Sequence, residues 1–213
     1  MTPNQDPRPV AVTVLTTEHF TLQGARAATI SESTGRATMF LGSVSGGLVA
    51  LGLVATAVGV GSAFFAVALV LLPTLVFVGI VTFDRVLQSG IEDLSYARRI
   101  IRLRDFYFDA APELTPYLMS VPVPARLAVL GLWSRRFQLF LTVAGMVAVI
   151  TAVLAGSAAG VLAAAASGRS LAISLAAGAL TGLVVLTALT WLQSVAWRRA
   201  DAAPLFEDRE QRE

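Results

Sequence analysis

The stretch from Thr38 to Phe83 contains no charged residue, and this feature constrains the fold more than any other. A helix needs roughly 20 apolar residues to cross a ~30 Å hydrocarbon core, and this stretch is about twice that long. It therefore predicts two membrane-spanning helices joined by a tight turn. Gly59-Val60-Gly61-Ser62 supplies the turn residues, so we expect the spans at about 38–58 and 63–83.

A second apolar region follows, and only Ser167-Gly168-Arg169-Ser170 interrupts it. It predicts a second hairpin over residues 137–197, with spans at about 137–157 and 171–195. The third span is expected to end between residues 154 and 159, because the glycines and serine around position 156 have low helix propensity.

The composition fits the same class of protein. Hydrophobic residues make up 55% of the 213 residues and charged residues only 14%, which is typical of an integral membrane protein. The expected fold is all-α, a polytopic membrane protein with four transmembrane helices in two hairpins and helical extensions into the cytoplasm.

The distribution of arginine predicts the orientation of these spans. All sixteen basic residues are arginine, and every one except Arg169 lies on the side of the two termini and of the segment 84–136. Short loops that carry arginine remain in the cytoplasm, so we expect both termini to be cytoplasmic, in the inner membrane of a bacterial cell. The net charge is only +2 and like charges form no long run, so no nucleic-acid partner is expected.

Apart from the second hairpin, the chain divides into four segments. Residues 1–16 are expected to be a flexible tail. Residues 17–110 are expected to contain a cytoplasmic helix capped by Thr16 or Thr17, the first hairpin, and a second cytoplasmic helix. A proline-rich connector with a short helix is expected over 111–136, and a charged tail over 198–213.

The helix after the second span has an amphipathic pattern. Its apolar side needs a partner, which could be the N-terminal helix, the same helix of a neighbouring subunit or the bilayer surface. The residues of this side recur at helical spacing and are Leu87, Ile91, Leu94, Ala97, Ile101 and Phe108.

The residue types that carry most metal and nucleophilic chemistry are scarce. His19 is the only histidine and cysteine is absent, so a zinc or iron site would lack ligands. Asp84, Glu92 and Asp93 could bind a metal in principle, but their spacing matches no motif. We therefore expect no enzymatic activity, no metal and no cofactor.

A basic cluster in the second cytoplasmic helix is the first candidate binding site. Arg98, Arg99, Arg102 and Arg104 could bind anionic lipid headgroups or a phosphate ligand. The alternative is a solvated helix whose arginines pair with nearby carboxylates and fix the membrane orientation.

Small residues and one proline are the remaining candidates. Two G-x-x-x-G motifs allow close helix packing, within one chain or between subunits. They are Gly42 and Gly46 in the first span, and Gly178 and Gly182 in the fourth. Pro73 lies in the middle of the second span, where it could act as a hinge or produce a static bend.

The N-terminal region also suggests a family. Its segment from Thr16 to Gln23 is followed by Ala25-Arg26, Ser31-Glu32 and Gly35-Arg36-Ala37 before the first span. On these residues, the region resembles uncharacterised four-span membrane proteins of actinobacteria. The layout of a cytoplasmic helix before and after a membrane hairpin is similar to that of SLATT-type membrane effectors of bacterial defence systems. That similarity implies an oligomer that perturbs the membrane when a cytoplasmic partner signals.

Together these features favour a non-enzymatic membrane component. We expect a homo-oligomer in the lipid bilayer that receives a cytoplasmic signal or protein partner. The alternative is an ion channel or small-solute transporter, although no span carries an ionisable group at membrane depth.

Overall fold

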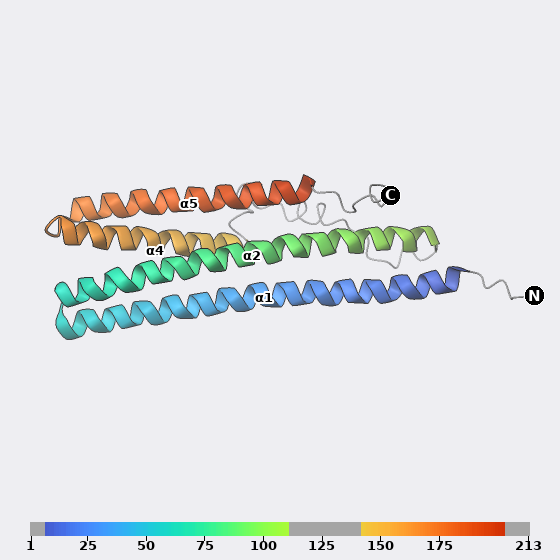
Figure 1. The fold of residues 1–213 in the computed structure, drawn as a ribbon, viewed down its shortest axis with the longest axis horizontal. Helices are drawn as coiled ribbons and strands as arrows, with labels where there is room; N and C mark the ends of the chain where they lie inside the picture. The colour runs from blue at the N-terminus through green and yellow to red at the C-terminus, as the bar shows by residue number, and fades with distance from the viewer. Residues whose placement is uncertain (1–6, 111–141, 203–213) are drawn as a thin grey trace, which may run out of the picture.

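The computed structural model describes residues 7–110 and 142–202, and these form four long helices (Figure 1). In chain order the helices are α1 (Pro7–Val58), α2 (Ser62–Ala110), α4 (Val143–Ala166) and α5 (Leu171–Ala202). Each contains a stretch long and apolar enough to cross a membrane. The described part of the chain is therefore all-helical, with two antiparallel hairpins, as the uncharged stretches predicted.

Both hairpin turns contain residues in the left-handed backbone region. Gly59 follows the last residue of α1 with φ of 71°, and Gly168 follows α4 with φ of 61°. Glycine adopts this conformation without a steric penalty, so it suits both turns. The end of α1 at Val58 is the one that the sequence predicted. Figure 1 shows that the two turns lie at the same end of the molecule, which we call the turn end.

The four helices pack in chain order. α1 packs along α2, α2 along α4, and α4 along α5, whereas α1 and α5 share no extensive contact. Figure 1 shows the same order, with α1 and α5 as the outer helices. The result is an open array, in which the two outer helices each keep an uncovered side.

The tightest part of the core lies where α1, α2 and α4 meet. Phe40, Leu72 and Val147 are almost completely buried there. A Cβ atom at Gly79 of α2 would overlap Oγ1 of Thr151 on α4 and would lie 3.1 Å from Cζ of Phe40. The absence of a side chain at Gly79 therefore allows α2 and α4 to approach closely.

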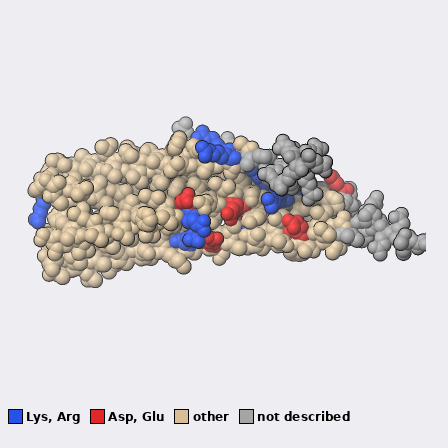
Figure 2. Space-filling model, viewed as in Figure 1, with Lys and Arg blue, Asp and Glu red and all other residues tan. Residues whose placement is uncertain are grey.

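α1 and α2 continue well beyond the apolar half of the molecule. Counted from the turn end, the first charged residue is Arg36 in α1 and Asp84 in α2. From these residues to the opposite end, each helix runs for roughly 40 Å at about 1.5 Å per residue. We call residues 7–35 and 85–110 the two-helix extension. Figure 2 shows the charged side chains gathered over the extension side of the molecule, with a basic group also at the far tip of the turn end.

The N-terminal boundary differs from the prediction. A flexible tail was expected over residues 1–16, but α1 begins at Pro7. Proline suits the first turn of a helix, where no backbone N–H partner is required. The expected cap at Thr16 or Thr17 is also wrong, because both residues lie inside α1. Thr17 Oγ1 donates to the carbonyl of Thr13 in the preceding turn at 3.0 Å.

Three helix boundaries of the second hairpin also differ from the prediction. The helix was expected from residue 137, but Thr142 caps α4, its Oγ1 accepting from the N–H of Gly145 at 3.0 Å. The end expected near 157 is wrong, because α4 continues to Ala166. α5 extends to Ala202, into the segment expected as a tail, while the predicted connector at 111–136 lies outside the described residues.

The amphipathic helix after the second span finds its partner within the chain. The N-terminal part of α1 packs along it, with Leu22 buried on α1 and Ile100 on α2. This selects one of the three partners that the sequence left open. The buried face is not quite the predicted one, because Ile101 is 42% exposed while the adjacent Ile100 is 7% exposed.

Candidate functional site

Among the described residues, α4 and α5 bring glycines against the backbone of the neighbouring helix. A Cβ atom at Gly156 would lie 2.7 Å from the carbonyl oxygen of Gly178, and one at Gly182 would lie 3.2 Å from that of Ala152. Gly160 lies against the Ser174 backbone in the same way. The predicted packing role of Gly178 and Gly182 therefore takes place inside one chain, against glycines that had been expected to end the third span.

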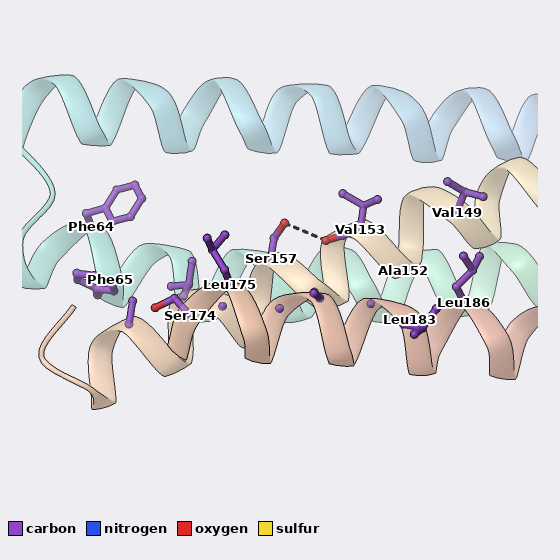
Figure 3. A pocket seen from close by; sticks show the side chains of 17 residues that line it. Phe64, Phe65, Val149, Ala152, Val153, Ser157, Ser174, Leu175, Leu183 and Leu186 are labelled. Atoms are coloured by element: carbon purple, nitrogen blue, oxygen red, sulfur yellow. Dashed lines mark hydrogen bonds between the residues drawn. The ribbon is translucent and has the colours of Figure 1, made fainter. Parts of the chain in front are cut away.

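Beside this contact lies an apolar groove of about 800 Å³ (Figure 3). Its floor and walls come from α4 and α5, and the aromatic rings at the start of α2 close its turn end. We call it the α4–α5 groove. It is lined by Phe64, Phe65, Val149, Ala152, Val153, Gly156, Ser157, Gly160, Val161, Ala164, Ser174, Leu175, Gly178, Ala179, Gly182, Leu183 and Leu186.

The hydroxyl groups in the groove are already bonded within their own helices. Ser157 Oγ donates to the Val153 carbonyl at 2.9 Å, and Ser174 Oγ donates to the Ser170 carbonyl at 2.8 Å. Each hydroxyl has a single proton to donate. The groove therefore offers mainly apolar contact to any occupant.

A single cation lies at the turn end of the groove. The guanidinium carbon of Arg169 lies 5.7 Å from the centroid of the Phe65 ring, within cation–π range. Arg169 has φ of 69°, the only positive value at a non-glycine residue in the described chain. Its exposed side chain has no carboxylate within ion-pair distance among the described residues.

The other predicted glycine pair has a different environment. A Cβ atom at Gly42 or Gly46 of α1 would meet no atom within 4 Å. Both glycines are exposed, on the side of α1 that faces away from α2. The same sequence motif therefore marks a contact in α5 and an uncovered surface in α1.

The four candidate arginines do not form one cluster. Arg98 Nη1 donates to the Ala200 carbonyl at the end of α5 at 2.8 Å, and its Nη2 pairs with Asp201. Arg99, Arg102 and Arg104 are exposed, and the charge of Arg104 acts on His19 of α1. Arg98 therefore ties α2 to α5, and the binding of anionic ligands by the four residues stays a prediction.

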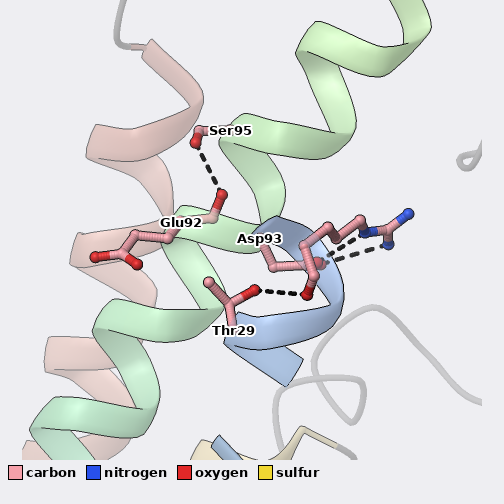
Figure 4. A network of polar contacts seen from close by, with 5 residues as sticks. Thr29, Glu92, Asp93 and Ser95 are labelled. Atoms are coloured by element: carbon pink, nitrogen blue, oxygen red, sulfur yellow. Dashed lines mark hydrogen bonds and ion pairs between the residues drawn. The ribbon is translucent and has the colours of Figure 1, made fainter. Parts of the chain in front are cut away.

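A second ion pair links the two helices of the extension (Figure 4). Arg26 Nε donates to Oδ1 of Asp93 at 2.7 Å, with a longer contact of 3.4 Å from Nη2 to Oδ2. Thr29 Oγ1 donates to the Arg26 carbonyl at 2.8 Å and is itself buried. The ion pair therefore joins α1 to α2, whereas the Thr29 hydrogen bond lies within α1.

His19 lies near the far end of this pair. Its Nε2 is 2.9 Å from Gln23 Nε2, and its ring meets that of Tyr107 edge to face at 6.1 Å between centroids. Burial lowers the pKa of His19 below its usual value of 6.5, and the charge of Arg104 lowers it further. The folded environment therefore favours the neutral imidazole relative to a fully solvated histidine.

One side of α1 in the extension exposes large apolar residues. Phe20 is 67% exposed and Ile30 is 51% exposed. They belong to a row of exposed residues spaced three or four apart, which is the spacing of one helix face. We call this row the α1 stripe, and it consists of Val12, Thr16, Phe20, Gln23, Ala27 and Ile30.

The remaining candidates have no special geometry. α2 continues without interruption through Pro73, whose side chain is exposed, so its role as a hinge stays a prediction. Within residues 7–110 and 142–202, no three histidine, aspartate or glutamate side chains come together in a group that could hold a metal ion.

Two packing features were missed in the sequence. Gln193 is completely buried on α5, and its Nε2 donates to Thr142 Oγ1 at 2.9 Å. It is the only amide in the apolar region of α5, and this could have marked it as a helix contact. Gly79 carried no signal, because it belongs to no small-residue motif.

Comparison with protein-family models, with curated proteins and with solved structures gives no match for this chain. The resemblance based on the N-terminal residues therefore stays a prediction.

Proposed function

We propose that this chain is a non-enzymatic, oligomeric component of a bacterial inner membrane whose two-helix extension receives a cytoplasmic protein partner. The observation that carries the proposal is the α1 stripe. Phe20 and Ile30 are more than half exposed on a part of α1 that lies beyond the apolar half of the molecule.

Large apolar side chains exposed along one helix face in water favour a protein contact. Spacing of three and four residues along α1 suits a second helix, which would bury the row by side-chain interdigitation. The other side of α1 already packs on α2 through Leu22, so a partner helix would complete a three-helix layer.

The orientation follows from the arginines. The two-helix extension and the end of α5 carry most of the described arginines, whereas the turn end carries Arg169 alone. The positive-inside preference therefore supports a cytoplasmic extension. The uncovered Gly42 and Gly46 on α1 support association of the spans between subunits.

The test measures the mass of the full chain in lipid nanodiscs by native mass spectrometry, combined with photocrosslinking from position 20 in cells. We expect an oligomer or a discrete crosslinked partner, and Phe20→Glu should weaken that association at least about tenfold. Ala28→Glu is the matched control, because Ala28 is exposed on α1 but lies outside the stripe. A monomer that yields no crosslink at position 20 would contradict the proposal.

An ion channel or small-solute transporter is the second candidate. It has less support, because the hydroxyls of the α4–α5 groove are bonded within their own helices. Ion or solute flux into liposomes that contain the purified chain would favour it over the leading proposal.

A further inference from the structure

The α4–α5 groove combines an apolar channel with a cation at one end. It follows α4 from Val149 to Ala164, which is about 22 Å at about 1.5 Å per residue. Half of a ~30 Å hydrocarbon core is about 15 Å, so the groove reaches from the turn end past the middle of a bilayer. That length is more than enough for a chain which enters at one surface and extends through one leaflet.

The lining excludes most other small ligands. Sugars, nucleotides and amino acids need several polar partners, but Ser157 and Ser174 already donate to their own helices. The surfaces that remain are the aliphatic side chains and the Cα atoms of the glycines. A hydrocarbon chain can fill such a groove without losing any hydrogen bond.

Charge then distinguishes a lipid from a second copy of the protein. Arg169 lies over Phe65 at the turn end of the groove, and no acidic residue occurs in 38–83 or in 137–195. The membrane-spanning part of a second copy could cover the groove, but it could not supply an anion to Arg169. The phosphate of a phospholipid supplies that anion, and a turn between two spans lies at the membrane surface, where such phosphates are.

We infer that the α4–α5 groove is a phospholipid-binding site, in which one acyl chain lies along the glycines of α4 and α5 and Arg169 binds the lipid phosphate. The site occupies the leaflet at the turn end. It does not depend on the oligomeric state or on the partner of the two-helix extension.

The glycine contact explains why an acyl chain fits here. Gly156 and Gly178 bring two backbones together, so no side chains fill the surface beside the crossing. Larger residues, such as Leu175, Leu183 and Leu186, stand along the groove (Figure 3). The walls can therefore contact an acyl chain along its length by dispersion forces.

The test uses the full chain in nanodiscs of palmitoyl-oleoyl phosphatidylglycerol, released into the gas phase for native mass spectrometry. Collisional activation is raised until loosely held lipids are lost. We expect the natural chain to retain one phospholipid per protein. Ala179→Phe, which places a ring in the groove, should lose it, and Ser157→Phe should do the same from the opposite wall.

The matched control is Ala188→Phe. Ala188 is exposed on α5 but lies outside the groove, half a turn around the helix from the face of Ala179. This variant should retain the phospholipid. Helix content measured by circular dichroism should be equal in all variants, which separates loss of the site from loss of the fold.

The headgroup contact is tested by Arg169→Asn. Asparagine tolerates the left-handed backbone of this position, so the substitution removes the charge and keeps the turn. The retained fraction of lipid should fall at least about tenfold, as expected for the loss of one charge-assisted hydrogen bond.

Two results would overturn the inference. One is equal lipid retention by the natural chain and by both Ala179→Phe and Ser157→Phe. The other is a lipid-free dimer that Ala179→Phe converts to monomers, because a second copy would then be the occupant of the groove.

Discussion

The two hairpins are held together by different kinds of contact. In α4–α5, Gly156 and Gly178 place backbone against backbone. In α1–α2, glycine meets side chains instead, since a Cβ atom at Gly47 would lie 2.9 Å from Cδ1 at the flexible end of Leu75. The second hairpin therefore has little freedom to adjust, whereas the first can rearrange side chains.

This difference shows what a small-residue motif means in a membrane helix. The pattern G-x-x-x-G allows close approach, but the partner decides whether that approach occurs. Gly178 and Gly182 face glycines on α4, while Gly42 and Gly46 face away from the rest of the chain. An added methyl group should therefore lower stability at the motif that packs on α4 and leave it unchanged or higher at the uncovered motif of α1.

The largest effect is expected for Gly156→Ala. The new methyl group would lie 2.7 Å from the Gly178 carbonyl oxygen, and a backbone atom cannot move aside without separating the helices. We expect the free energy of unfolding to fall by about 1–3 kcal/mol. Titration of the purified protein with SDS, followed by circular dichroism, measures this change.

The control for that prediction is Gly42→Ala in α1. No atom of the same chain lies within 4 Å of the added carbon, and alanine has the better helix propensity. The stability of the detergent-solubilised single chain should therefore stay equal or rise by up to about 1 kcal/mol. Equal destabilisation by the two substitutions would remove the distinction between the hairpins.

An intermediate effect is expected for Gly79→Ala, at the junction of the two hairpins. The added carbon would overlap Thr151 Oγ1, which is a side-chain atom. We expect a loss of about 1–2 kcal/mol in the free energy of unfolding. Thr151→Ala removes the obstructing atoms, so the double variant should regain most of the loss, as a double-mutant cycle would reveal.

If the double variant is as unstable as Gly79→Ala alone, then the backbone, and not Thr151, limits the approach of α2 to α4. The cycle is suitable because Thr151 Oγ1 donates only to the Val147 carbonyl of its own helix, at 2.7 Å. Its removal leaves no other buried group without its hydrogen bond.

The sequence predicted the local features of this fold and missed those that depend on distant residues. The uncharged stretches predicted four helices, and the glycines at 59 and 168 predicted the turns. The end of α4 was misplaced, because propensity at Gly156 is a local quantity whereas its packing partner, Gly178, lies on the next helix. Tertiary contact thus keeps a glycine-containing segment helical.

The same limit applies to the candidate sites. The sequence placed four arginines in one cluster, but Arg98 pairs with Asp201, 103 residues away along the chain. The α1 stripe was also not recognised, since Gln23 and Thr16 interrupt its apolar pattern. Which side of an amphipathic helix stays exposed depends on the packing of its neighbours, and single-helix periodicity does not contain that information.

A small effect is expected where side-chain charge joins the two helices of the extension. Arg26 and Asp93 are 41% and 26% exposed, so their pair should contribute about 0.5 kcal/mol, decreasing with salt. Arg26→Gln should speed hydrogen exchange around Ile100 on α2. Arg36→Gln is the control, because Arg36 pairs with Glu32 within α1 and its loss should leave exchange in α2 unchanged.

The smallest effect is expected from the protonation of His19. Burial and then Arg104 lower its pKa in the folded chain below 6.5, so the unfolded chain takes up a proton at a higher pH than the folded chain does. Stability should therefore fall as the pH decreases from 6.5 to the folded pKa, and stay level below it. His19 is the only histidine, so an NMR titration of the imidazole gives its pKa without ambiguity, and His19→Gln should abolish this part of the pH dependence. A pKa above 6.5 would mean that the α1–α2 contact at Tyr107 stabilises the charged ring, and the extension would then tighten in acid.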